Sequence, residues 1–201
     1  MVLSDREIWK EINKRSGHRI VFDPVLLPEQ VRVSSIDLRV GSRFVRWRFA
    51  KEGTERTVRS HLILDEISGY ASLEQAYGEQ ITVPPGKRYV LEPGESVLAW
   101  TYEKVAMPPH LAGRIEGRST LARLGLSIHN TAPTIHPGFG YSRDGRPIGQ
   151  PICLEISNAN PHVTLEITPG SMKSCISQLI LERVTSSPRE LYFRKGQFTP
   201  G

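Results

Sequence analysis

The stretch SVLAWTYEKV, residues 96–105, decides the fold class. It is a short run rich in β-branched and aromatic residues, which favour strands, and a Pro-Gly pair at 93–94 precedes it as a turn signal. Similar runs follow, and Pro-Gly pairs at 85–86, 137–138 and 169–170 punctuate the chain. The further runs are FVRWRF (44–49), ICLEIS (152–157), HVTLEI (162–167) and SCISQLILERV (174–184). Many short strands separated by turns predict a mainly β fold, as a sandwich, barrel or jelly roll.

Two short helices are expected among these strands. In SDREIWKEI, residues 4–12, Ser4 can cap a helix, and Glu7 can close a capping box three residues later. The Ser, Thr, Leu, Ala and Arg residues of GRSTLARLG, residues 117–125, suit a single helical turn. We therefore expect one helix near the N-terminus and one that interrupts the strands.

Length and composition predict a single domain over residues 1–201. The chain is 38% hydrophobic and 23% charged, which is typical of a soluble globular protein. The N-terminus has no signal-peptide core, and no apolar run approaches membrane-spanning length, so we expect a cytoplasmic protein without a membrane partner. Cys153 and Cys175 lie in apolar, strand-like segments, which predicts buried free thiols.

The formal net charge of +5 suits an anionic partner such as phosphate, nucleotide or nucleic acid. A platform for single-stranded nucleic acid would interleave aromatic and basic residues, and the sequence shows no such stretch. We therefore do not expect nucleic acid as the partner.

The stretch GRSTLARLGL, residues 117–126, is a candidate anion site. Arg118 and Arg123 supply fork-shaped donors that match phosphate oxygens. Ser119 and Thr120 add hydroxyls beside the first free N–H groups of the helical turn. The same residues also suit a capped surface helix with solvated arginines, and residue types alone leave both interpretations open.

Glu155 is a candidate general base or acid. It lies inside the apolar run ICLEIS, where strand alternation puts it on one face with Cys153 and Ser157, opposite the Ile and Leu side chains of the run. A carboxylate partly buried in a strand costs free energy unless it is paired or neutralised, and such groups are candidates for proton transfer. A Glu–Arg ion pair inside an assembly explains the residue equally well.

The histidines do not indicate a metal site. Neither His129 nor His136 has a partner at metal-ligand spacing, and we expect His129 to be structural. Zinc-dependent deaminases carry a His-x-Glu and a Pro-Cys-x-x-Cys signature, and the sequence has neither.

Three motifs together resemble the dCTP deaminases of the trimeric dUTPase-like superfamily. They are GRSTLARLGL (117–126), TAPTIHPGF (131–139) and ICLEISN (152–158). The opening MVLSDREI, the run VSSIDLRVG (33–41) and the segment 90–117 agree with the same family, and the tail YFRKGQFTP (192–200) resembles its closing segment loosely. The resemblance covers most of the chain.

The resemblance implies a distorted β-barrel or jelly roll, and a homotrimer with active sites between subunits. It also implies deamination of dCTP to dUTP and ammonia, which supplies dUTP for thymidylate synthesis. Mg²⁺ would be carried by the triphosphate rather than by a protein cage, without zinc. The tail, at about residues 188–201, would close over the bound nucleotide.

The resemblance also assigns roles to residues. Glu155 would be the general acid and base. Arg118, Ser119 and Thr120 would hold phosphates and help to fix the reacting water, and Arg123 would lie near the pyrimidine ring and that water. The remaining substrate contacts would come from the backbone around Thr131 and Ala132 and from His136, Gln178, Tyr192 and Gln197.

Three features depart from the family pattern. His136 replaces an Asp that contacts the sugar 3′-hydroxyl and that is tied to phosphate-bond hydrolysis in the dUTPases and the dual-function relatives. The polar segment YSRDGRPIGQ, residues 141–150, is an insertion, which we expect to be an exposed loop; the alternative is that it reaches over a substrate. The tail has no lysine in the family register.

Two other functions stay open. One is a dUTPase or a dual enzyme that releases pyrophosphate, against which His136 argues. The other is a catalytically silent, nucleotide-binding regulatory relative. The presence of Arg118, Ser119, Arg123 and Glu155 argues against a silent relative, because such a protein would be free to lose Glu155.

Overall fold

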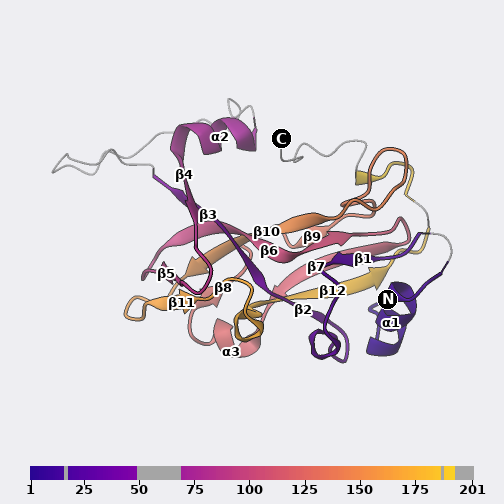
Figure 1. The fold of residues 1–201 in the computed structure, drawn as a ribbon, viewed down its shortest axis with the longest axis horizontal. Helices are drawn as coiled ribbons and strands as arrows, with labels where there is room; N and C mark the ends of the chain where they lie inside the picture. Colours follow the sequence, from indigo (N-terminus) through magenta and orange to yellow (C-terminus); the bar gives the residue numbers. More distant parts are fainter. Residues whose placement is uncertain (16–17, 49–68, 187, 193–201) are drawn as a thin grey trace.

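The computed structural model describes residues 1–15, 18–48, 69–186 and 188–192, and Figure 1 shows them as antiparallel strands with short helices at the periphery. The helices are α1 (Asp5–Ile12), α2 (Tyr70–Tyr77) and α3 (Ser119–Ala122), with 3₁₀ turns η1 (Pro28–Gln30) and η3 (Met172–Ser174). The strands are β1 (Val21–Asp23), β2 (Ile36–Leu38), β3 (Val40–Trp47), β4 (Gly78–Thr82), β5 (Tyr89–Leu91), β6 (Ser96–Ala106), β7 (Leu111–Gly117), β8 (Leu126–Ser127), β9 (Thr134–Ile135), β10 (Gln150–Asn158), β11 (Leu165–Ile167) and β12 (Ser177–Arg183). The predicted mainly β class is confirmed.

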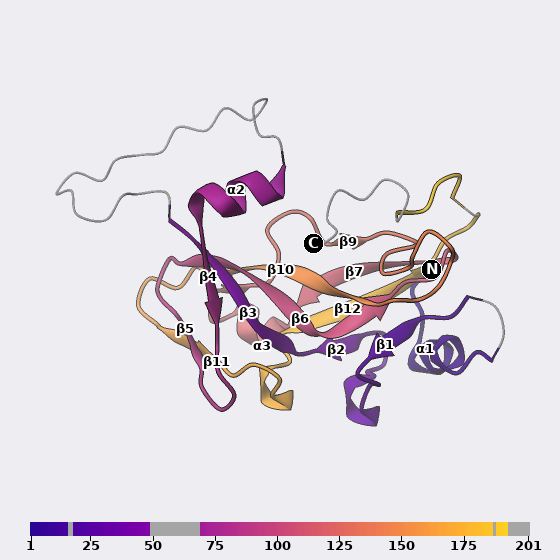
Figure 2. The same cartoon turned by 45° about the horizontal axis from the view of Figure 1, so that its top comes forward.

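The strands form two larger antiparallel sheets and one small one. The first sheet has the order β4-β3-β6-β10-β8, with β1 also paired to β6. The second has the order β2-β12-β7-β9, and β11 pairs with β5. With 11 residues, β6 is long enough to pair with β1, β3 and β10. Segments far apart in the sequence therefore lie side by side in the sheets (Figure 2).

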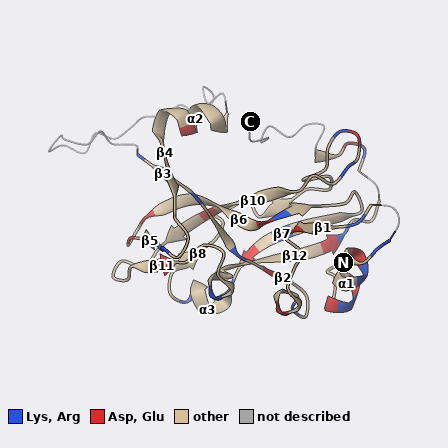
Figure 3. Cartoon of the chain, viewed as in Figure 1, with Lys and Arg blue, Asp and Glu red and all other residues tan. Residues whose placement is uncertain are grey.

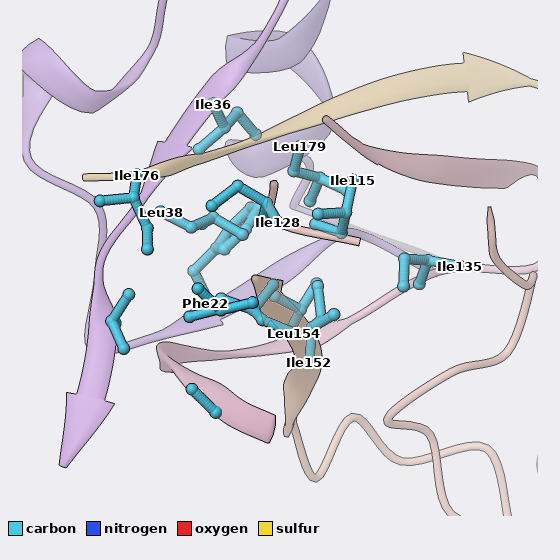
Figure 4. Close-up of a cluster of buried hydrophobic side chains, with 14 of the residues drawn as sticks. Phe22, Ile36, Leu38, Ile115, Ile128, Ile135, Ile152, Leu154, Ile176 and Leu179 are labelled. Atoms are coloured by element: carbon cyan, nitrogen blue, oxygen red, sulfur yellow. The ribbon is translucent and has the colours of Figure 1, made fainter. Parts of the chain in front are cut away.

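The core lies between the apolar faces of the two larger sheets (Figure 4). Ile152 and Leu154 enter it from β10, and Ile115 and Leu179 enter it from β7 and β12; all four are at most 2% exposed. Burial of apolar surface on this scale is the main stabilising contribution to such a fold. Two sheets packed through their inner faces agree with the predicted distorted jelly roll.

Both predicted helices are confirmed. α1 begins after Ser4, whose N–H donates to Glu7 Oε2 at 3.2 Å in the expected capping box. α3 occupies the arginine stretch as a single turn. The sequence pattern does not predict α2, because this helix has no buried residue and so no apolar stripe to recognise. Within the described ranges, no helix is both long and apolar enough to cross a membrane.

The expectation of two buried thiols is wrong for Cys153. Cys175 is buried, and its burial raises the pKa of the thiol to about 11. Cys153 is exposed, because the alternation of β10 turns it away from the core face that carries Ile152 and Leu154. A run of apolar residues thus predicted the strand correctly, but not the burial of each member.

Candidate functional site

The arginine stretch forms a tight, exposed turn between two strands. β7 ends at Gly117, and the carbonyl of Arg118 accepts the N–H groups of Leu121 and Ala122, both at 2.9 Å. Ser119, Thr120 and Arg123 are exposed. In the described part of the chain, no hydrogen bond or ion pair engages the side chain of Arg123.

Gly125 sets the exit of this turn toward β8. Its φ is +89°, and an added Cβ would lie 2.7 Å from the backbone nitrogen of Asn160. A side chain here would both strain the backbone and collide with the neighbouring loop. Gly125 therefore fixes where the arginine turn lies relative to β8 and β10.

Arg118 and Gln178, predicted as substrate contacts, are brought together by Asp37. Arg118 donates through Nη1 to the carbonyl of Cys175 at 3.1 Å and lies 3.8 Å from Asp37 Oδ2. Gln178 Nε2 donates to Asp37 Oδ1 at 3.0 Å, and Arg32 Nε donates to Oδ2 at 2.9 Å. Because Asp37 is only 1% exposed, these donors provide the pairing that a buried carboxylate requires.

Cross-strand pairing extends this cluster along the second sheet. Gln178 of β12 lies opposite Asp37 of β2 on one side and Glu116 of β7 on the other. Glu116 Oε2 lies 3.6 Å from Nε2 of His129, which follows β8. The Nδ1 atom of His129 is buried without a hydrogen-bond partner among the described residues. His129 thus lies beside Glu116, at the end of the cross-strand row formed with Asp37 and Gln178. Its structural role stays a prediction.

Glu155 occupies a half-buried position on the outer face of β10. Its neighbours Ile152, Leu154 and Ile156 point into the core, as strand alternation predicts. Glu155 Oε2 accepts the backbone N–H of Asn130 at 3.0 Å, and the N–H of Glu155 donates to the carbonyl of Ile128 at 3.0 Å. Within the described ranges, no Lys or Arg lies within ion-pair distance of the carboxylate. A half-exposed carboxylate held by one N–H keeps free acceptor sites for a water molecule.

The segment whose backbone is expected to contact the substrate base comes directly after Asn130, whose N–H donates to Glu155. Thr131 and Ala132 are exposed and come immediately after Asn130. The same short loop therefore holds the Glu155 carboxylate and presents the backbone expected to contact a pyrimidine.

His136 and Tyr192, which are far apart in the sequence, stack on each other. Their ring centroids are 5.6 Å apart at an interplanar angle of 16°, and Tyr192 also lies 5.9 Å from the Phe139 ring. The N–H of Tyr192 donates to the carbonyl of Pro137 at 3.0 Å, and burial raises the pKa of the Tyr192 phenol. The start of the tail thus docks on the His136 turn. Gln197 lies outside the described residues.

The segment 141–150, expected to be an exposed loop, forms a hairpin closed by the Tyr141–Pro147 bridge. It is exposed at Arg143, Asp144 and residues 146–148, whereas its last residue, Gln150, begins β10. Its anchor is the buried Tyr141, whose hydroxyl donates to the carbonyl of Arg19 at 2.6 Å, while Arg143 and Arg146 are exposed. An open pocket of about 300 Å³ lies beside it. The lining residues are His18, Pro109, Gly138, Tyr141, Arg143, Asp144, Gly145 and Leu191. None of the predicted site residues lines this pocket.

The structure therefore brings the predicted residues together in three groups. These are Arg118 with Gln178, Glu155 with the loop leading to Thr131 and Ala132, and His136 with Tyr192. In the described part of the chain, no hydrogen bond or ion pair joins Glu155 to the arginine turn. Sequence reasoning missed Asp37, although a carboxylate between Ile36 and Leu38 carries the same signal that singled out Glu155.

The fold and its polar groups define a class: a jelly roll with an arginine-serine turn at one strand end and a half-exposed strand carboxylate. Residues 2–184 match the dCTP deaminase-like family, and the chain belongs to that family. It is 39% identical over 199 residues to a protein of Corynebacterium glutamicum named dCTP deaminase, dUMP-forming, with 98% of this chain and 88% of the relative covered.

Other relatives and one solved structure agree. The chain is 34% identical over 191 residues to a Methanosphaera stadtmanae protein, also named dCTP deaminase, dUMP-forming, with 95% and 83% covered. A Pectobacterium atrosepticum protein named dCTP deaminase is 35% identical over 177 residues, with 88% and 82% covered. The crystal structure of 2′-deoxycytidine 5′-triphosphate deaminase from Agrobacterium tumefaciens matches with a TM-score of 0.59 at 19% identity, over 91% of this chain. This likeness shows the fold, and the chain spans 48% of that solved chain.

Proposed function

We propose that this chain hydrolyses the C4 amino group of dCTP, giving dUTP and ammonia, with Glu155 as general acid and base. The observation that carries the proposal is the half-exposed Glu155 carboxylate, held by the Asn130 N–H without a cationic partner in the described chain, in a member of the dCTP deaminase-like family. Water adds at C4 and gives one proton to ring N3. The hydroxyl of the adduct then gives its proton to the amino group, which leaves as ammonia while the C4 carbonyl forms. One carboxylate near the ring can carry both protons.

The remaining roles follow from the groups that the fold assembles. We assign Arg118, Ser119 and Thr120 to the phosphates, since guanidinium forks and hydroxyls match phosphate oxygens. Arg123, exposed at the end of the turn, is assigned to the ring and the water. The remaining assigned contacts are the Thr131–Ala132 backbone, His136, Gln178, Tyr192 and Gln197. Mg²⁺ enters with the triphosphate as part of the substrate.

The product is proposed to retain its triphosphate. His136 lies where the family's Asp is tied to phosphate-bond hydrolysis, and its imidazole stacks on Tyr192. A neutral or cationic imidazole is a poor substitute for the carboxylate of that Asp. The second candidate is conversion of dCTP to dUMP, which the names of the relatives from Corynebacterium and Methanosphaera favour.

Product analysis tests both candidates. The protein is incubated with Mg²⁺ and dCTP, CTP, dCMP or dUTP, and the products are resolved by chromatography. We expect ammonia and dUTP from dCTP, and no pyrophosphate. The appearance of dUMP and pyrophosphate would show the second candidate to be correct, and the absence of ammonia would contradict deamination itself.

The variant Glu155→Gln tests the catalytic assignment. An amide of similar shape cannot take a proton from water, so we expect ammonia release to be lost. Nucleotide binding should stay within about tenfold of the parent, or about 1.4 kcal/mol. Turnover of the variant at the parent rate would show that Glu155 is not the base.

A further inference from the structure

The loop between β8 and β9, residues 128–133, carries the N–H that holds Glu155. Asn130 is exposed and belongs to neither strand. Its N–H nevertheless lies 3.0 Å from Glu155 Oε2. Something other than a strand ladder must therefore fix where this N–H points.

Two serines that face each other across β8 and β10 contact this loop. Ser127 and Ser157 are paired in register. The Ser127 hydroxyl donates to the carbonyl of His129 at 2.9 Å, and the Ser157 hydroxyl donates to Asn130 Oδ1 at 3.4 Å. Both hydroxyls thus engage the two residues whose shared peptide group supplies the N–H to Glu155.

The Ser157 hydroxyl is itself oriented by a third serine. Ser96 of β6, which lies opposite Ser157 on the other side of β10, donates its hydroxyl to Ser157 Oγ at 3.0 Å. Because Ser157 Oγ accepts the hydrogen of the Ser96 hydroxyl, the Ser157 hydroxyl can donate its own hydrogen to Asn130 Oδ1. The row Ser96, Ser157, Asn130 therefore runs across the strands on the face that carries Glu155.

We propose that Ser127 and Ser157 are positioning residues for deamination, which set the 128–133 loop so that the Asn130 N–H meets the Glu155 carboxylate. The inference rests on the proposed function of Glu155. The carbonyl that Ser127 engages belongs to the same peptide group as the Asn130 N–H, so this hydroxyl fixes the orientation of that group. Small misplacements of a reacting group lower the rate of a chemical step strongly. The two serines act on kcat through the loop, without touching the nucleotide.

The test compares Ser127→Ala and Ser157→Ala with the parent protein, using Mg²⁺ and dCTP. We expect kcat to fall about five- to tenfold in Ser127→Ala and by a smaller factor in Ser157→Ala, whose bond is longer, with KM within about twofold. Ser127→Thr and Ser157→Thr keep the hydroxyl and should restore kcat. The matched control is Ser142→Ala, which removes a hydroxyl that bonds to Arg146 within the 141–150 hairpin and should leave kcat unchanged.

Amide hydrogen exchange of Asn130 gives an independent readout. In the alanine variants its N–H should exchange faster than in the parent, while amides of the β6–β10 ladder keep their protection. If an alanine variant does not fold, Ser127→Cys and Ser157→Cys keep the side-chain volume with a weaker donor and should show the same changes.

The failure of this inference can be told apart from the failure of the proposed function. An inactive parent, or full activity in Glu155→Gln, contradicts the proposed function. If the parent is active and Glu155→Gln is not, parental kcat and parental Asn130 exchange in both serine variants overturn the positioning role alone. A loss that appears only in KM overturns it as well.

Discussion

At the scale of single residues, Arg118 is the clearest test of anion binding. Its guanidinium bonds to the carbonyl of Cys175 and lies beside Asp37, and 39% of the side chain remains exposed for a ligand. We predict that Arg118→Ala weakens binding of dCTP at least about tenfold, because a charge-assisted phosphate contact is lost. Calorimetric titration with dCTP and with deoxycytidine checks this, since the nucleoside should bind both proteins equally.

A matched control lies on the strand just before the turn. Arg114→Ala removes an exposed arginine of β7 that pairs with Glu182, and it should leave dCTP binding unchanged. Equal losses for nucleoside and triphosphate in Arg118→Ala would contradict the phosphate role.

The sequence singled out the candidate site residues individually, but it did not predict the partners that the fold gives them. Alternation along ICLEISN gave the face of Glu155, and the same argument applied to VSSIDLRVG would have found Asp37. Gln178 is 141 residues away from Asp37 along the chain, so only the pairing of β12 with β2 brings them together. Local patterns carry no information on such pairings, because they depend on which strands become neighbours.

At the scale of elements, α1 is attached through a buried carboxylate. Glu11, 5% exposed, accepts from His110 Nε2 at 2.8 Å and from Arg183 Nη1 at 3.1 Å, and it pairs with Lys14 at 3.4 Å. Figure 3 shows that α1 carries charges of both signs. Burial alone would raise the pKa of Glu11, but the hydrogen bond and charge of His110, together with Lys14, leave it below the usual value.

We predict that Glu11→Gln lowers the free energy of unfolding at pH 7 by about 1–3 kcal/mol, since a charged acceptor with several donors is lost. Because the folded-state pKa is lowered, the ionised group stabilises the fold above the ordinary Glu pKa. That contribution is lost as the pH falls through the lowered value. Urea unfolding at pH 7 and near pH 3 should therefore show the variant and the parent converging at acid pH.

The exposed Glu29 supplies the control for this experiment. Glu29→Gln should stay within about 0.5 kcal/mol of the parent at both pH values. A constant difference between Glu11→Gln and the parent across this range would mean that packing, not charge, sets the effect.

Elements differ in how well the sequence predicts them. The capping box predicted α1 and the apolar run ICLEIS predicted β10, because both signals are local in the sequence. The contact of Arg39 with the fully buried Glu103 spans 64 residues, and it depends on how β6 lies against the segment between β2 and β3. The alternation and turn patterns predicted β3, β6, β10, β11 and β12 and the mainly β class, while several further strands and the strand order came from the structure alone.

At the scale of the whole molecule, the relation of Glu155 to the arginine turn bears on assembly. Within the described residues of one chain, Glu155 bonds to Asn130 and Arg118 bonds to Cys175, and no hydrogen bond or ion pair joins Glu155 to the turn. We propose that each site takes the carboxylate from one subunit and the arginine turn from its neighbour. The homotrimer that the family resemblance implies would provide three such sites by symmetry.

Mixing two defective variants tests whether the sites are shared. Glu155→Gln should be inactive, and Arg118→Ala, which binds dCTP at least about tenfold more weakly, should keep about a tenth of the parent activity or less when dCTP is well below saturation. The two proteins are unfolded and refolded together in equal amounts. A shared site is intact when its Glu155 comes from an Arg118→Ala chain and its Arg118 comes from a Glu155→Gln chain. Random assembly should therefore restore about a quarter of the parent activity. A site built within one chain would restore nothing, because every chain carries a defect. The measurement is ammonia release from dCTP, with each variant refolded alone as the control.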